Sequence, residues 1–207
     1  MKYDLDRLLD RRGTDTYKWE RIEPLFGDPD IIPVWIADIE FAVMPEITQA
    51  LSDRAAHPSY GYTDPPRDLF DNIISWNRRR NGIDIDKKLM FLSPDVTTSV
   101  TMGLRALVAP GDRVIVNTPA YHPFFDCVSL AGAECVELPL VYAKDRYDFD
   151  FESFEEALRG GAKALVFCNP QNPVGRIWTK DEIARIASLC ARYNAAVIAD
   201  EVHSDLI

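Results

Sequence analysis

Four short runs rich in β-branched residues alternate with helical segments in the second half of this chain. The runs are RVIVNT (113–118), ECVELPL (134–140), ALVFCN (164–169) and AVIAD (196–200). Strands that alternate with helices are typical of a parallel sheet whose crossover helices cover its faces. The pattern therefore predicts an α/β fold with a mostly parallel sheet and flanking helices.

The segments between and before these runs carry helix signals. Thr179 and Glu182 have capping-box spacing at the start of one helix, and Ser153 and Glu156 have the same spacing ahead of another. The helix after Thr179 has apolar residues on one face: Ile183, Ile186, Ala187, Cys190 and Tyr193. Further helices are expected near residues 46–56, with Ile47, Ala50 and Leu51 on one face, near 67–80, and around Leu5 to Leu9.

Charge and composition exclude several classes of protein. The chain has 23 Lys and Arg against 33 Asp and Glu, a net charge of −10, and no long basic run, which disfavours a nucleic-acid partner. No apolar run approaches the roughly 20 residues that cross a bilayer, and the opening MKYDLDRLLDRRGTD is too charged for a secretory signal. We expect a cytoplasmic protein with no membrane partner.

Cysteines and histidines give no metal-binding pattern. The four cysteines lie mostly in apolar segments without C-x-x-C spacing: Cys127, Cys135, Cys168 and Cys190. The three histidines are not at ligand spacing either: His57, His122 and His203. We therefore expect reduced, mostly buried thiols and no metal site.

Polar or aromatic segments follow the predicted strands, where ligands bind in open parallel sheets. They are PAYHPF after the first run, NPQNPVGR after the third, and Asp200 at the end of the fourth, with His203 three residues later. Two prolines fix the backbone on either side of Asn172. Tyr121 is either a packed core ring or a plate for a flat cofactor. No dinucleotide-binding or P-loop glycine motif is present.

Asp200 and the segment SPDVTTSV can each be explained either by ligand binding or by ordinary structural contacts. The Asp200 carboxylate, partly desolvated, needs a cationic or N–H partner, which a protonated heteroaromatic nitrogen, an arginine or a helix start would supply. SPDVTTSV opens a helix with Val100, Leu104 and Leu107 on one face. Its free N–H groups, with the hydroxyls of Thr97 and Thr98, suit a phosphate, although ordinary N-capping explains the same residues.

Taken together, the motifs resemble one family from about residue 4 to the last residue. DRRGTDTYKW, PVWIADIEF, YGYT, PAYHPF, CNPQNPVGRIWTKDEI and ADEVHSDL resemble the MalY/PatB-type cystathionine β-lyases and cysteine-S-conjugate β-lyases. These are fold-type I pyridoxal-phosphate enzymes within the class I and II aminotransferases. The resemblance implies pyridoxal 5′-phosphate as cofactor and an amino acid as substrate.

The resemblance also implies roles for individual residues. Asp200 would pair with the pyridine nitrogen, Asn172 with the cofactor's phenolic oxygen and the substrate, and Tyr121 would stack on the ring. His203 would lie near the same phenolic oxygen.

The phosphate and substrate contacts follow in the same way. The backbone at Val96 and Thr97 would hold the phosphate, and Tyr62 of YGYT would reach the phosphate in the neighbouring subunit of a homodimer. Ala37 would line the side of the substrate carboxylate. The family usually has glycine where this chain has Asp95, whose charge is unfavourable beside a phosphate unless it points away or caps the helix.

The lysine that forms the Schiff base with the cofactor has no counterpart here. The chain's lysines are Lys2, Lys18, Lys87, Lys88, Lys144, Lys163 and Lys180. None follows a core strand in a loop like the family's S-x-x-K, and in relatives that lysine comes later than the point where this chain stops. We expect the 207-residue chain alone to be inactive.

The ending DEVHSDLI directly follows a predicted core strand, without a helix or strand to cover the edge of the sheet. We therefore expect a sheet that is incomplete at the C-terminus. Residues 1–45 would form an arm and part of a small domain. Residues 46–207 would form the front portion of the large cofactor-binding domain, with the remainder absent.

Three functions remain. The first is elimination at the C–S bond of a cysteine-type amino acid, giving thiol, pyruvate and ammonia. The second is transamination on the same fold and cofactor. The third is a truncated, non-catalytic chain that acts as an interaction module.

Overall fold

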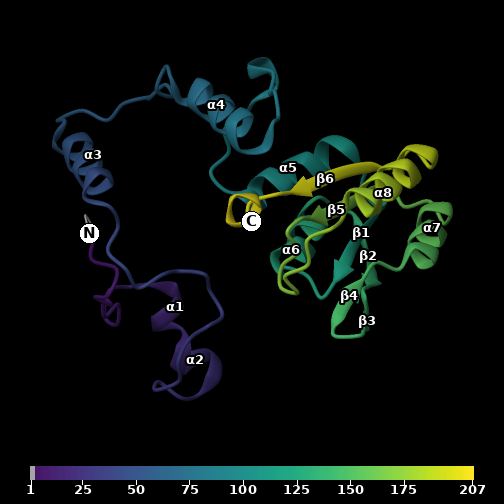
Figure 1. Cartoon of the computed structure of the whole chain (residues 1–207), viewed down its shortest axis with the longest axis horizontal. Coiled ribbons are helices and arrows are strands. Elements are labelled where there is room, and N and C mark those ends of the chain that lie inside the picture. The colour runs from purple at the N-terminus through teal and green to yellow at the C-terminus, as the bar shows by residue number, and fades with distance from the viewer. Residues whose placement is uncertain (1–2) are drawn as a thin grey trace. The chain divides into compact units, whose positions relative to one another are not determined.

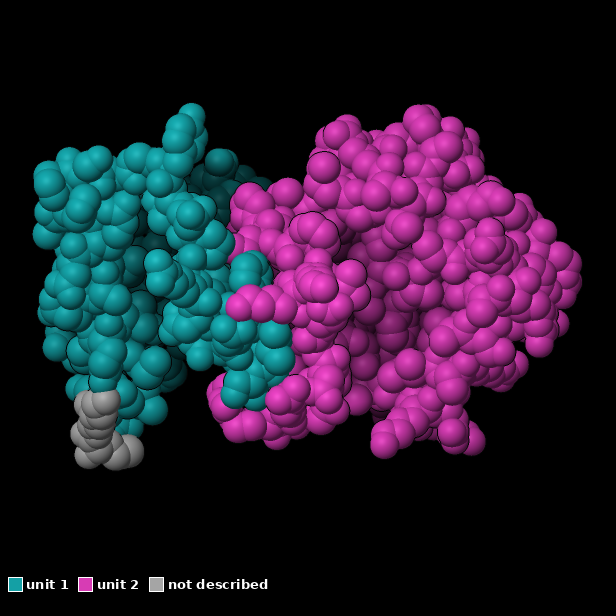
Figure 2. Space-filling model, turned by 90° about the horizontal axis from the view of Figure 1, so that it is seen from above, with its two compact units in different colours: residues 1–75 teal, residues 76–207 magenta. Residues whose placement is uncertain are grey.

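The computed structural model describes residues 3–207 and separates into two compact units. Unit 1 comprises residues 1–75 and unit 2 residues 76–207, coloured teal and magenta in Figure 2. The sequence places a boundary at residue 45, between an N-terminal arm with part of a small domain and the large cofactor-binding domain. That boundary stays a prediction.

Unit 2 is built on a four-stranded parallel sheet in the order β2-β1-β5-β6. The strands are β1 (Arg113–Thr118), β2 (Glu134–Pro139), β5 (Ala164–Cys168) and β6 (Ala196–Asp200). Each predicted run ends within one residue of the observed strand. The predicted parallel α/β fold is confirmed.

Two helices pack on each face of the sheet (Figure 1). Helices α5 (Val96–Leu107) and α6 (Pro123–Leu130) cover one face, and α7 (Phe151–Arg159) and α8 (Lys180–Arg192) cover the other. Alternation along a strand sends neighbouring side chains to opposite faces. All five residues of β5 are accordingly buried, as a central parallel strand requires.

The sheet has a switch point between β1 and β5. From β1 the chain moves outward to β2 on one side, and it later returns to β5 on the other side before moving outward to β6. Among the described residues, the β1–β5 ladder ends at Val116 and Val166. The outer ladders continue to Thr118–Pro139 and Cys168–Asp200. The strands thus separate at the edge where parallel sheets bind ligands.

The predicted helix after Thr179 is confirmed, including its capping box with Glu182. One part of the predicted face was wrong. Ala187 is exposed and Leu189 is buried, because the burial follows the positions at i and i+3 from Ile186.

The cap predicted for α7 was also wrong. Asp150, not Ser153, is its N-cap, and the Asp150 carboxylate accepts from the backbone N–H groups of Glu152 and Ser153. The Asp150 carboxylate satisfies two free N–H groups of the first turn. Ser153 already lies within the helix, so its hydroxyl cannot cap those groups.

The predicted helices near 46–56 and 67–80 are confirmed as α3 (Pro45–Ala56) and α4 (Leu69–Asn81). The expected face of α3, formed by Ile47, Ala50 and Leu51, is exposed. Leu107 of α5 is also exposed, whereas Val100 and Leu104 are buried as predicted.

The helix predicted around Leu5 to Leu9 does not form. The Leu9 backbone N–H donates to the distant Glu40 carbonyl at 2.7 Å, whereas a helix would need it to bond to the Leu5 carbonyl. The first helices are α1 (Tyr17–Glu20) and α2 (Ile22–Phe26).

The remaining elements are short. The hairpin of β3 (Val141–Ala143) and β4 (Arg146–Asp148) and the 3₁₀ turns η1 (Lys87–Leu89) and η2 (Ser204–Leu206) were not predicted. Within residues 3–207, no helix has both the length and the apolar character needed to cross a bilayer.

In unit 1, two of the motifs that carry the family resemblance contact each other. The Lys18 ammonium is buried and bonds to the Glu40 carboxylate at 2.9 Å and to the Asp38 carbonyl at 2.7 Å. Trp19 Nε1 donates to the same carboxylate, and Trp35 Nε1 donates to the Lys18 carbonyl. The hydrogen bond from Lys18, and then the one from Trp19, hold the pKa of Glu40 below its usual value.

Candidate active site

The loops at the carboxyl edge of the unit 2 sheet are joined to one another by hydrogen bonds. The backbone N–H of Asn169, after β5, donates to the Asp200 carbonyl at 3.0 Å. The Cys127 thiol of α6 lies 3.4 Å from the Thr97 carbonyl in the first turn of α5. The edge therefore brings together the segments that contain Val96, Thr97, Tyr121, Asn172, Asp200 and His203.

Asp200 ends β6 as a buried carboxylate, 7% exposed. It lies opposite Cys168, and strand alternation puts it on the face of Ala196 and Ile198, which pack toward α5 and α6. Its Oδ1 accepts from the Val202 backbone N–H at 3.0 Å. In the described part of the chain no arginine or lysine pairs with it, so the carboxylate keeps the capacity to bind a cationic group.

Asn172 lies half-buried in the loop between β5 and α8. Its side chain bonds to nothing within residues 3–207, so its amide remains available to a ligand. The far end of the loop is anchored by Trp178. The indole Nε1 of Trp178 donates to the Cys168 carbonyl at 3.1 Å, and its backbone N–H donates to Asn169 Oδ1 at 3.2 Å.

Tyr121 follows β1 and is 39% exposed, so it is not a core ring. Its edge contact with Phe124, at a centroid distance of 5.5 Å and an interplanar angle of 84°, fixes the ring from one side. A ring held in this way can stack on a flat ligand. His203, after β6, is half-buried at the start of η2.

Asp95 occupies the start of α5, where a phosphate was expected. Its carboxylate accepts from the Thr98 backbone N–H and from the hydroxyls of Thr97 and Thr98. The Thr97 hydroxyl, then Thr98, lower the pKa of Asp95 to about 2. Both hydroxyls are therefore engaged by Asp95. The expected phosphate donors are the backbone N–H groups of Val96 and Thr97, and Asp95 competes for the second, because the Thr97 N–H is a further, smaller cause of its low pKa.

A shallow cavity of about 280 Å³ lies beside this turn, between the outer surfaces of α5 and α6. It is lined by Thr97, Thr98, Thr101, Met102, Pro123, Asp126, Cys127 and Leu130.

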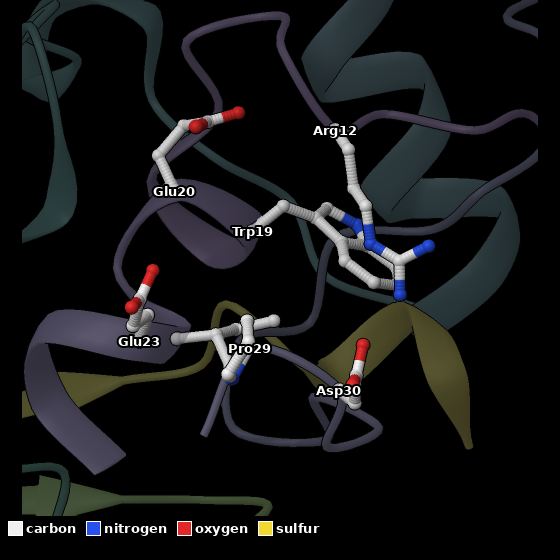
Figure 3. A pocket seen from close by; sticks show the side chains of 7 residues that line it. Arg12, Trp19, Glu20, Glu23, Pro29 and Asp30 are labelled. Carbon is white, nitrogen blue, oxygen red and sulfur yellow. The ribbon is translucent and has the colours of Figure 1, made fainter. Parts of the chain in front are cut away.

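A larger cavity of about 340 Å³ lies within unit 1 and contains none of the predicted site residues. Figure 3 shows the Arg12 side chain beside the ring of Trp19, and the guanidinium lies 4.9 Å from the ring centroid. The remaining lining is Glu20, Ile22, Glu23, Pro29 and Asp30. We place the chemistry at the sheet edge, because the buried carboxylate, free amide and helix start are there.

Ala37 and Tyr62 lie in unit 1, and both are exposed. Ala37 neighbours Asp38, whose carbonyl binds Lys18. Tyr62 is in the loop between α3 and α4. Their roles in the site stay predictions.

Sequence reasoning missed two buried polar residues at the switch point. Asn117 is 6% exposed, and its Nδ2 has no hydrogen-bond partner in the described part of the chain. Gln171 is 4% exposed and fully hydrogen-bonded. An asparagine within RVIVNT was a visible signal, because a polar side chain in a buried strand needs a partner.

The buried thiols Cys168, at the carboxyl edge, and Cys190, near the end of α8, are not nucleophiles. Burial, with the Asp200 charge, raises the pKa of Cys168 to about 11, and burial raises that of Cys190 to about 11. Such thiols are protonated at neutral pH. All four cysteines are free, and Cys135 is exposed, contrary to its expected burial.

None of the lysines among residues 3–207 lies where the family's Schiff-base lysine is expected, in a loop after a core strand. Lys163 precedes β5 and lies at the amino edge, where its backbone bonds to Arg113 and Ala196. Lys18 is held by Glu40. Among residues 3–207, none directly follows a strand of the four-stranded sheet.

The residues at this edge fit a flat, phosphorylated heteroaromatic cofactor. A buried carboxylate without a cationic partner suits a protonated ring nitrogen, a free amide suits a ring oxygen, and a half-exposed aromatic suits stacking. The helix start suits a phosphate, although Asp95 adds an opposing charge. This combination is typical of cofactor-binding sites at the carboxyl edge of parallel α/β sheets.

Comparison with known proteins identifies the family. The family described as aminotransferase class I and II matches residues 30–207, and the chain belongs to it. Cystathionine beta-lyase PatB of Bacillus subtilis (strain 168) is 35% identical over 99% of this chain and 53% of its own length. The predicted family resemblance is confirmed.

Solved structures agree with the fold. The PLP-bound putative aminotransferase from Clostridium difficile 630 has a TM-score of 0.91 and 32% identity over 98% of this chain and 52% of its own. Cystalysin from Treponema denticola, which contains pyridoxal 5′-phosphate, has a TM-score of 0.90 and 30% identity over 99% of this chain and 53% of its own. The predicted fold type is confirmed. The chain spans about half the length of the curated relatives it matches.

Proposed function

We propose that this chain forms part of a pyridoxal-phosphate-dependent C–S β-lyase. The substrate would be a cysteine-type amino acid such as cystathionine or a cysteine conjugate, and the products thiol, pyruvate and ammonia. The observation that carries the proposal is the buried Asp200 carboxylate, which lacks a cationic partner among the described residues. Relatives named cystathionine beta-lyase support the reaction.

Each residue at the carboxyl edge has a stated task in this proposal. Asp200 holds a proton on the pyridine nitrogen, because an adjacent carboxylate favours the charged form of a base. Asn172 donates its free amide to the phenolic oxygen, and Tyr121 stacks on the ring. The first N–H groups of α5, at Val96 and Thr97, bind the phosphate.

The chemistry follows from these contacts. Bound pyridoxal phosphate supplies an electron sink for the charge that remains when Cα loses its proton. Asp200 maintains that sink by keeping the ring nitrogen protonated. Cleavage of the C–S bond would leave its electron pair on sulfur as a thiolate, and hydrolysis of the remaining three-carbon product would give pyruvate and ammonia. The amine that binds the cofactor would come from a lysine outside these 207 residues.

Asp200→Ala in the complete gene product tests the assignment. We expect the elimination rate to fall by orders of magnitude with the fold retained. Asn172→Ala should be milder, because it removes a neutral hydrogen bond worth about 0.5–1.5 kcal/mol. Small and equal effects would place the pyridine ring elsewhere.

The assay also separates the reaction types. Release of pyruvate from cystathionine without an added keto acid supports the lyase. A requirement for a keto acid supports the aminotransferase, the activity after which one structural neighbour is named. If the complete protein binds no pyridoxal phosphate, the non-catalytic alternative is favoured.

The covalent link has its own test. The 207-residue chain should show no cofactor absorption that survives dialysis and is bleached by borohydride. The complete protein should show it. Such a signal from the short chain would mean that one of its lysines serves after all.

We also propose a cytoplasmic homodimer with shared sites. Four free thiols are typical of a reducing compartment, and the fully exposed Tyr62 in its own loop suits a contact with a neighbouring subunit. Mixing Tyr62→Phe and Asp200→Ala subunits should give hybrids with one intact site, and hence recovered activity. A mixture no more active than its parents would contradict shared sites.

A further inference from the structure

Gln171 occupies an unusual place in the loop between β5 and α8. Its side chain is 4% exposed, and its Nε2 donates to the Pro119 carbonyl at 2.7 Å. Its Oε1 accepts from the Val174 N–H at 3.1 Å. Its backbone N–H bonds to Arg176 and its carbonyl to Gly175. Every backbone group and the carboxamide of this residue are therefore engaged.

The bond to Pro119 crosses the point where the sheet separates. The β1–β5 ladder ends at Val116 and Val166, three residues before Pro119. Beyond it, the Thr118 carbonyl bonds away from β5, to the Leu140 N–H at 2.7 Å. The Gln171 carboxamide thus joins the loop after β5 to the loop after β1 where their strands no longer pair.

The two loops joined in this way contain the two residues assigned to the cofactor ring. Asn172 directly follows Gln171, and Tyr121 lies two residues after Pro119. A buried carboxamide with both ends bonded has little freedom to move. The Gln171–Pro119 distance therefore sets how far apart the two loops stand.

We propose that Gln171 is a positioning residue of the site. Its Nε2–Pro119 bond fixes the separation of the two loops, and thereby places the Asn172 amide against the phenolic oxygen of the cofactor. This inference rests on the proposed function and adds to it a residue that does not itself touch cofactor or substrate.

Two substitutions separate positioning from simple loop closure. Gln171→Glu keeps the side-chain shape and the oxygen that accepts from the Val174 N–H. At neutral pH the ionised carboxylate has no hydrogen to donate to the Pro119 carbonyl. Gln171→Met keeps the length and loses both bonds. Gln49→Met is the matched control, because Gln49 donates to Asp53 on the exposed surface of α3.

The experiment uses the complete gene product with pyridoxal phosphate. It measures the cofactor dissociation constant, the pH at which the bound cofactor's absorption titrates, and the melting temperature without cofactor. An amide that donates to the phenolic oxygen favours its deprotonated form. Both Gln171 variants should therefore raise the titration midpoint by about half a pH unit and weaken cofactor binding by about tenfold. Gln49→Met should change neither.

The outcomes distinguish this inference from the function beneath it. Gln171 variants that lower only the melting temperature, with a wild-type midpoint and dissociation constant, assign the residue to loop closure and overturn the inference alone. If Gln171→Met fails to fold, Gln171→Glu decides. A wild-type protein that binds no pyridoxal phosphate overturns the proposed function and this inference together.

Discussion

The Asp95 carboxylate accepts a hydrogen bond from the Thr98 backbone N–H at 2.7 Å and caps the helix that begins the candidate site. These bonds lower its pKa from 3.8 to about 2, with the Thr97 hydroxyl as the largest cause. A carboxylate with a depressed folded-state pKa stabilises the fold above its unfolded pKa and loses that contribution as the pH falls through its folded pKa.

Asp95→Ala should therefore lower the free energy of unfolding at pH 7, and the deficit should shrink between about pH 4 and pH 2. Urea unfolding followed by circular dichroism across this range measures it. Asp64→Ala, in an exposed loop, is the control. A deficit that stays constant down to pH 2 would contradict the cap.

Asp95→Asn should strengthen phosphate binding. The amide oxygen still caps the helix, while the negative charge beside the phosphate disappears. We expect inorganic phosphate and pyridoxal phosphate to bind several-fold tighter, and the gain to diminish as salt rises, because screening weakens charge repulsion. Titration calorimetry at two salt concentrations measures this. Unchanged affinity at low salt would mean that the phosphate lies elsewhere.

Arg176 joins the loop of Asn172 to the β3–β4 hairpin and to α8. Its guanidinium donates to the Tyr147 carbonyl at 2.7 Å and pairs with the Glu182 carboxylate, and its side chain is 13% exposed. Arg176→Ala should cost about 3 kcal/mol, since it removes the nearest cation from a partly buried carboxylate and leaves only Arg146, at 4.0 Å, to pair with it. Arg176→Lys should recover little of the lost stability, because a single ammonium cannot bond to the Tyr147 carbonyl and the Glu182 carboxylate together as the planar guanidinium does.

The matched control is Arg192→Ala. Arg192 pairs with Glu155 at 3.2 Å on the surface, with a side chain that is 62% exposed. Its removal should cost under about 1 kcal/mol. Similar losses for the two variants, measured by urea unfolding, would contradict the role of Arg176.

Thiol reactivity should separate the four cysteines. Cys135 is exposed, although partial burial and the Glu137 charge raise its pKa, whereas Cys127 is buried and burial raises the pKa of Cys168 and of Cys190 to about 11. Cys135 should therefore be the first thiol to react with iodoacetamide in the native protein, slowly at neutral pH and faster as the pH rises, and all four should react in urea. Peptide mapping identifies it. Rapid native labelling of Cys168 would contradict its placement beside Asp200.

The sequence predicted the sheet and its covering helices because periodicity and burial are local signals. The runs around Val114 and Leu165 are short, apolar, rich in β-branched residues and bounded by turn signals, which favours buried strands. Asp200 was found for a related reason, since a carboxylate at the end of such a run stands out.

The features that the sequence did not predict depend on neighbours far along the chain. Gln171 bonds to the carbonyl of Pro119, which lies 52 residues earlier in the chain. Asn117 is the first residue of β1 beyond the last β1–β5 pair, and the local sequence does not indicate where that pairing ends. The helix expected near Leu5 does not form for the same kind of reason, because the Leu9 N–H donates to the Glu40 carbonyl, 31 residues later in the chain.

The early end of the β1–β5 ladder divides the sheet into two pairs of strands, β2–β1 and β5–β6, that share only three residue pairs. Cooperative opening follows the lines where the fewest backbone bonds must break. Native-state amide exchange should therefore group the amides of β1 with those of β2, and the amides of β5 with those of β6. A cofactor bound at the proposed site, where the two pairs separate, would slow the opening of both groups together and make the two halves of the sheet one cooperative unit.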